Sequence, residues 1–154
     1  GPLLPGIREY TITPGEKTTT ISGKGKAGLK QEENYYFFYL PVCYKGITGK
    51  SYAYYNTSRS KNLYLPASVD ENYSYDIQLP ENLTLCTPIQ EKKIDNPIGS
   101  FKITLTSEGS SLHIELALQI KKQLITPAEY PAFRSLITEW TDRTRKPILF
   151  KTVQ

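Results

Sequence analysis

Few side chains in this chain of 154 residues could support covalent or metal chemistry. The sequence contains two cysteines, Cys43 and Cys86, and one histidine, His113. A structural zinc site needs four ligands of suitable spacing, which these three residues do not supply. A nucleophilic site would need a cysteine beside His113 and an aspartate. His113, however, occupies a polar position of a predicted strand, and neither cysteine begins a helix that would lower the pKa of its thiol. We therefore interpret His113 as a solvent-facing structural residue.

The cysteines allow two interpretations. In an exported protein Cys43 and Cys86 could form a disulfide, whereas in a reducing compartment they would be ordinary buried thiols. Residues 23–28 are rich in glycine and lysine, but they lack the spacing and the Ser/Thr of a phosphate-binding loop. The carboxylates are scattered along the chain. The sequence thus predicts no catalytic residue, no metal site and no cofactor, and we expect that this chain is not an enzyme.

Tyrosine is the most distinctive side chain of the sequence, with twelve copies, eight of them between positions 35 and 64. Exposed tyrosines on a β-sandwich could stack on sugar rings, and the candidates for such a ligand-stacking site are Tyr52, Tyr54, Tyr55 and Tyr64. The other interpretation is that the tyrosines fill the core and seal its rim, as amphipathic rings commonly do. We favour the second interpretation and keep a polysaccharide as a possible partner.

Composition places limits on the class of protein. A chain of this length with 38% hydrophobic and 22% charged residues is expected to form one globular domain. A net charge of +4 is too small to indicate a nucleic-acid partner or an anionic membrane surface. No apolar run approaches the roughly 20 residues of a transmembrane segment. Because Gly1-Pro2 resembles the remnant of a cleaved expression tag, we assign residues 1–6 to a tag scar and linker and residues 7–154 to a single domain.

The stretch from 111 to 140 organises the fold. Between Leu112 and Ile120 apolar and polar residues alternate, which predicts a strand with one face on a core. Between Tyr130 and Trp140 the apolar spacing is helical. Thr126 and Glu129 form a capping box before this helix, and Pro131 predicts either a kink or a separate first turn.

Several shorter segments predict further strands, at residues 7–13, 17–26, 34–42, 73–79, 101–105 and 147–153. The segment 34–42 is apolar throughout, which favours a strand covered on both sides. The segment 147–153 begins with proline and is predicted to lie near a sheet edge. Residues 95–99 form a turn cluster. Together these patterns predict a mostly β domain, an antiparallel β-sandwich with one C-terminal helix followed by a final strand.

Five features, in this order, carry a family resemblance: Tyr35-Tyr36-Phe37-Phe38-Tyr39-Leu40-Pro41, Tyr73-x-Tyr75-x-Ile77-x-Leu79-Pro80, Gly99-x-Phe101, the long strand from Leu112, and Ile125-x-x-x-Glu129-Tyr130-x-x-Phe133-Arg134. With them the chain resembles the C-terminal all-β domain of large exported bacterial proteins that carry a transglutaminase-like core. The resemblance implies a Gram-negative exported protein, periplasmic or attached to the outer surface. It also implies that catalysis belongs to a preceding core, so no catalytic residue is assigned here.

The expected function is therefore that of a non-catalytic accessory domain, which packs on or orients a neighbouring transglutaminase-like domain. Its expected partners are the preceding domains of its parent chain. A carbohydrate-binding module that uses exposed tyrosines is the alternative.

Overall fold

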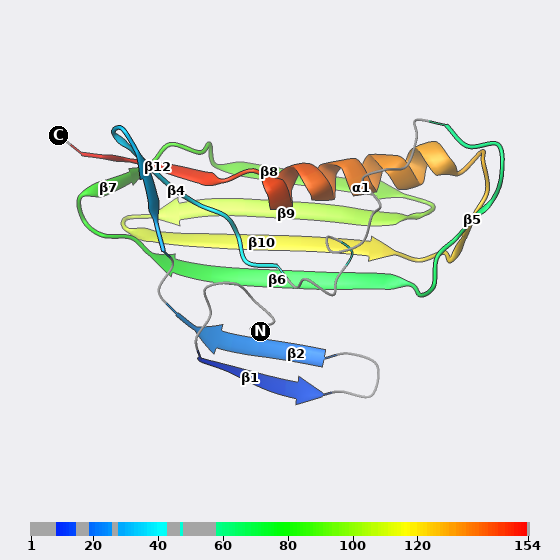
Figure 1. Cartoon of the computed structure of the whole chain (residues 1–154), viewed down its shortest axis with the longest axis horizontal. Helices are drawn as coiled ribbons and strands as arrows, with labels where there is room; N and C mark the ends of the chain where they lie inside the picture. Colours follow the sequence, from blue (N-terminus) through cyan, green and yellow to red (C-terminus); the bar gives the residue numbers. More distant parts are fainter. Residues whose placement is uncertain (1–8, 15–18, 26–27, 43–46, 48–57, 154) are drawn as a thin grey trace.

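A computed structural model describes residues 9–14, 19–25, 28–42, 47 and 58–153 of the chain. In these residues the fold is mostly β, built from antiparallel sheets, with one C-terminal helix followed by a final strand (Figure 1). This confirms the fold class that the sequence predicts. The elements are β1 (Glu9–Pro14), β2 (Thr19–Lys24), β3 (Lys30–Glu32), β4 (Tyr35–Phe38), β5 (Leu63–Tyr64), β6 (Val69–Gln78), β7 (Leu83–Leu85), β8 (Gln90–Asn96), β9 (Gly99–Glu108), β10 (Ser111–Ile120), β11 (Leu124–Ile125), α1 (Tyr130–Arg145) and β12 (Ile148–Thr152).

The largest sheet has four strands in the order β6-β10-β9-β8, and β10 lies at its centre. The alternation predicted for β10 is confirmed, because Leu112, Ile114, Leu116, Leu118 and Ile120 are all buried while the residues between them are not. The antiparallel register aligns three of these residues, Ile114, Leu116 and Leu118, with Leu105, Ile103 and Phe101 of β9. One face of the sheet is therefore apolar and the other polar. We call these the inner and outer faces of the main sheet.

Two different layers cover the inner face. Over one part, α1 packs Phe133, Leu136 and Trp140 against Phe101 and Leu118 of the sheet. Over the rest, a second sheet in the order β3-β4-β12-β7 packs against it. In Figure 1 the helix and this second sheet lie end to end along the same side of the main sheet. Burial of each large apolar side chain contributes about 1.5–3 kcal/mol, so both layers are needed to stabilise the long strands.

The second sheet corrects two predictions. β12 is not at an edge, because it pairs with β4 on one side and β7 on the other. Pro147 immediately precedes the strand, so its missing N–H interrupts no ladder hydrogen bond. The segment 34–42 forms only a four-residue strand, and it is not covered on both sides: Tyr35 and Tyr39 are each 48% exposed.

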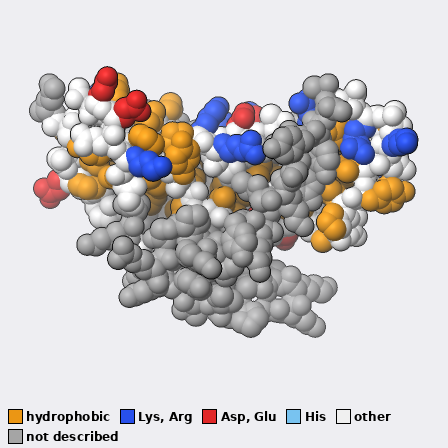
Figure 2. All heavy atoms as spheres, viewed as in Figure 1, with side chains coloured by type: hydrophobic (Ala, Val, Ile, Leu, Met, Phe, Trp, Pro, Cys, Tyr) orange, Lys and Arg blue, Asp and Glu red, His pale blue; other side chains and the backbone are white. Residues whose placement is uncertain are grey.

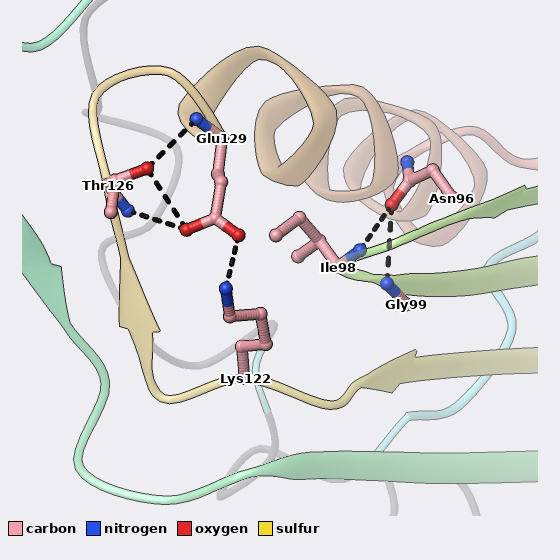
Figure 3. Close-up of polar contacts among 6 residues, drawn as sticks. All are labelled: Asn96, Ile98, Gly99, Lys122, Thr126 and Glu129. Atoms are coloured by element: carbon pink, nitrogen blue, oxygen red, sulfur yellow. Dashed lines mark hydrogen bonds and ion pairs between the residues drawn. The ribbon is translucent and has the colours of Figure 1, made fainter.

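The helix entry and the turn before β9 are close together (Figure 3). Thr126 and Glu129 form the predicted capping box. The Thr126 N–H donates to Glu129 Oε1 at 3.1 Å, and the Glu129 N–H donates to Thr126 Oγ1 at 3.3 Å. The box closes a separate turn, and α1 begins at Tyr130, next to Pro131. In the turn between β8 and β9, Asn96 Oδ1 accepts the N–H of Ile98 at 2.9 Å, which confirms the predicted turn.

Candidate functional site

His113 projects from the outer face of the main sheet, between two carboxylates. Its Nδ1 lies 2.7 Å from Asp76 Oδ1, and its Nε2 lies 3.4 Å from Glu115 Oε1. Asp76 is its register partner on β6, and Glu115 is two residues along β10. The hydrogen bond to Asp76, and then that to Glu115, raises the pKa of His113 above its ordinary value. Both ring nitrogens face carboxylates, so the geometry is that of a structural ion pair. The half-exposed position agrees with the predicted solvent-facing histidine, but the two carboxylate partners were not predicted.

Cys86 and this histidine belong to different sheets. It directly follows β7 in the second sheet, and its N–H donates to the Leu149 carbonyl at 2.8 Å. That sheet covers the inner face, whereas His113 is on the outer face, so Cys86 and His113 do not form a nucleophilic pair. Cys43 lies outside the described residues, so its pairing with Cys86 stays a prediction. Within the described part of the chain, no three His, Cys, Asp or Glu side chains are grouped so as to hold a metal ion.

The candidate stacking tyrosines are only partly placed. Tyr64 on β5 is 72% exposed, and it pairs with Leu124 of β11, which is 41% exposed. Tyr52, Tyr54 and Tyr55 lie outside the described residues, so the proposed row of rings stays a prediction. Tyr36 is half-buried and packs on the core, as the second interpretation of the tyrosines expects.

The outer face of the main sheet is polar. Its two shallow hollows are lined by hydrogen-bonding side chains, including Asn72, Ser74 and Lys102 in one and Gln78, Thr106 and His113 in the other. The outward positions of β6, β8, β9 and β10 carry no Phe, Tyr or Trp. This face therefore offers hydrogen bonds but no flat aromatic surface for stacking.

The outer face of the second sheet carries a group of apolar side chains, which sequence reasoning missed. Phe37 of β4 and Leu149 of β12 are register partners, and the Phe37 and Tyr39 rings meet edge to face at 6.3 Å. Tyr35 and Val153 continue the same face, and we call these five residues the β4–β12 face. Figure 2 shows hydrophobic side chains gathered at the left of the view, where Figure 1 places β4, β7 and β12. A continuously apolar sequence cannot reveal this face, since its periodicity does not distinguish one covered side from two.

Among the residues that the structure describes, no helix combines the length and the apolar composition needed to cross a bilayer. The described helix α1 has 16 residues and packs its apolar side on the main sheet instead.

Comparison with known proteins identifies a family and a solved structure that this chain resembles. Residues 34–150 match the profile of a family described as a domain of unknown function with a solved structure, DUF3858. A solved chain from Parabacteroides distasonis ATCC 8503, described as a "putative protease", is 32% identical and superimposes with a TM-score of 0.70. The match covers 78% of the present chain and 24% of that chain, so the present chain spans about a quarter of that relative. No curated protein matches.

Proposed function

The chain belongs to the DUF3858 family, and from this premise we propose that it is a non-catalytic accessory domain, which packs on and orients a preceding transglutaminase-like domain of a larger parent chain. The observation that carries the proposal is that the match occupies 24% of a larger relative, so that in the relative this fold is one part among several. The relative's description as a "putative protease" is consistent with catalysis by another part of the parent chain. The transglutaminase-like identity of the neighbour rests on the resemblance alone.

Calorimetric titration of this chain with the preceding segment of its reading frame tests the proposal. Saturable binding, with a heat capacity that falls as apolar surface is buried, is the expected result. Interfaces between domains of one chain are modest in area and partly polar, so micromolar affinity is sufficient when the two parts are covalently linked. No heat of binding, together with the same unfolding temperature for the domain alone and within the parent, would contradict it.

A carbohydrate-binding module is the second candidate, and the exposure of Tyr64 favours it. A ring that is 72% exposed can stack on a sugar without rearrangement of the core. The test is titration with soluble polysaccharides, in which binding should be lost in Tyr64→Ala. Tyr39→Ala, at the other end of the described fold, is the matched control.

The resemblance also leads us to propose that the parent protein is exported, to the periplasm or the outer surface. Fractionation of cells that express the complete reading frame would test this. Recovery of the protein in the cytoplasmic fraction would contradict it.

A further inference from the structure

The β4–β12 face departs from the usual pattern of a sheet with one covered side. Such a sheet alternates apolar residues towards the core with polar residues towards water. The main sheet follows this rule, whereas the second sheet has apolar side chains on both faces. Phe38, Ile148 and Phe150 are buried on its inner face. On its outer face Leu149 is 36% exposed, Tyr35 and Tyr39 are 48% exposed, and Val153 is 57% exposed.

These exposed side chains form one surface. Phe37 and Leu149 face each other across two paired strands, at a spacing of about 5 Å between neighbouring Cβ atoms. Tyr39 contacts the Phe37 ring, and Val153, just past the end of β12, is two positions beyond Lys151. Isolated exposed apolar residues are ordinary, but a contiguous group of them marks an interaction surface.

Charged residues of β3 border this apolar group, and Lys151 lies within it, between Leu149 and Val153. Lys30 of β3 pairs with Phe37, Glu32 pairs with Tyr35, and Lys151 of β12 pairs with Tyr35 from the other side. All three charged residues are exposed. An apolar centre that includes aromatic rings, with a polar and charged rim, is the usual composition of a protein–protein interface.

From this geometry we propose that the β4–β12 face is the surface on which the preceding domain of the parent chain packs, through an apolar patch of its own. The inference rests on the proposed accessory function and assigns its contact surface. A preceding domain is the expected binding partner of this face because about three quarters of the related chain lies outside the match and is covalently attached to the matched part. Attachment raises the effective concentration to the millimolar range, so a small, partly aromatic face is enough for stable packing.

Thiol labelling tests the contact surface in the intact parent protein, without separating its domains. Leu149→Cys and Val153→Cys place a thiol on the β4–β12 face, and each is made both in this chain and in the complete parent. Leu124→Cys is the matched control, because Leu124 is an equally exposed leucine of a strand at the other end of the fold. Peptide mass spectrometry reads each site separately from the native Cys43 and Cys86. Val153 lies beyond the end of β12, so its variant gives the result even if Leu149→Cys folds poorly.

Maleimide labelling at 149 and 153 is expected to be at least tenfold slower in the parent than in this chain, with unchanged labelling at 124. If labelling were slower at 124 alone, the two domains would still pack together but through a different surface. That result would overturn the assignment of the β4–β12 face. Unchanged rates at all three positions would overturn the assignment, and the calorimetric titration would then decide separately whether the domains pack at all. Labelling of this chain alone that slows with rising protein concentration would assign the face to a second copy and overturn the inference.

Discussion

Gly99 lies directly against the main chain of Gln119: a Cβ built on Gly99 would be 1.8 Å from the Gln119 carbonyl oxygen and 3.1 Å from the Ile120 Cα. Gly99 opens β9 at the point where the register aligns it with Ile120, the last residue of β10. Because the obstructing atoms belong to the backbone, no side-chain rotation can relieve the contact. The Gly99-x-Phe101 feature therefore has a steric cause.

We expect Gly99→Ala to lower the free energy of unfolding by about 2–4 kcal/mol, since the clash must separate the first pair of β9 and β10. Urea denaturation measures the change. Gly28→Ala is the control, because no atom lies within 4 Å of a Cβ at that position. Equal stability of the two variants would contradict the steric explanation.

The capping box before α1 yields a second prediction. Thr126→Ala removes one of the two acceptors of the Glu129 N–H, which keeps the Thr126 carbonyl at 3.0 Å, and it also removes the hydroxyl that donates to Glu129 Oε1 at 3.0 Å. The change should cost about 1 kcal/mol of stability. Thr106→Ala, on the outer face of the main sheet, is the control. A double-mutant cycle with Glu129→Gln should show that the two changes are not additive. Strict additivity would mean that the box does not act as a unit.

Glu129 should also make the fold sensitive to acid. Hydrogen bonding to Lys122, and then to the Thr126 N–H, lowers the pKa of this carboxyl below its ordinary value. Because the pKa of Glu129 is lower in the folded state than in the unfolded state, its carboxylate stabilises the fold. This stabilisation is fully present above the unfolded-state pKa of about 4.3, and it is lost as the pH falls through the folded-state pKa. The loss of stability on acidification, followed by thermal melts, should be smaller in Glu129→Gln than in the wild type. The same loss in both would contradict the prediction.

His113 predicts a pH dependence of the opposite sign. Because Asp76 and Glu115 raise its pKa, its contribution to stability is complete below the unfolded-state pKa of about 6.5 and is lost as the pH rises through the folded-state value. Asp76→Asn should lower the pKa of the imidazole, as measured by NMR titration. Asp70→Asn on the same strand is the control, because Asp70 pairs with Gln119 and accepts a bond from Asn72. If Asp70→Asn lowered the pKa of His113 as much as Asp76→Asn does, the cause would be the overall charge of the sheet and not the contact with Asp76.

Tyr75 provides a test of the core below the second sheet. Its hydroxyl donates to the Pro41 carbonyl at 2.5 Å, and burial raises the pKa of the phenol above its usual range. Tyr75→Phe should cost about 1 kcal/mol, because the Pro41 carbonyl loses its donor. The exposed Tyr64→Phe should be neutral. In a spectrophotometric alkaline titration, Tyr75→Phe should abolish one phenol whose pKa lies above the usual range of tyrosine. Equal stability of the two variants would contradict this assignment.

The local elements of this protein follow from the sequence. The alternation from Leu112 to Ile120 assigns each residue of β10 to a face, and helical spacing with a capping box locates α1 and its separate entry turn. These signals are readable because they depend on neighbours within a few residues, where period and hydrogen-bond geometry are fixed by the backbone. The turn at Asn96 is equally local, since its side chain bonds the N–H two residues on.

The arrangement of the strands was decided by tertiary structure. Nothing in the sequence of residues 147–153 states that β12 lies between β4 and β7, and nothing in the apolar run at 34–42 states that one of its sides is left open. Likewise, the pairing of His113 with Asp76 depends on the register of strands 37 residues apart. Side-chain period determines which residues share a face, but strand order, register and the layer that covers each face depend on contacts between distant segments. The β4–β12 face is formed by such contacts between distant segments. The sequence therefore determined the local elements of this domain, while the tertiary structure alone revealed the surface by which we expect it to act.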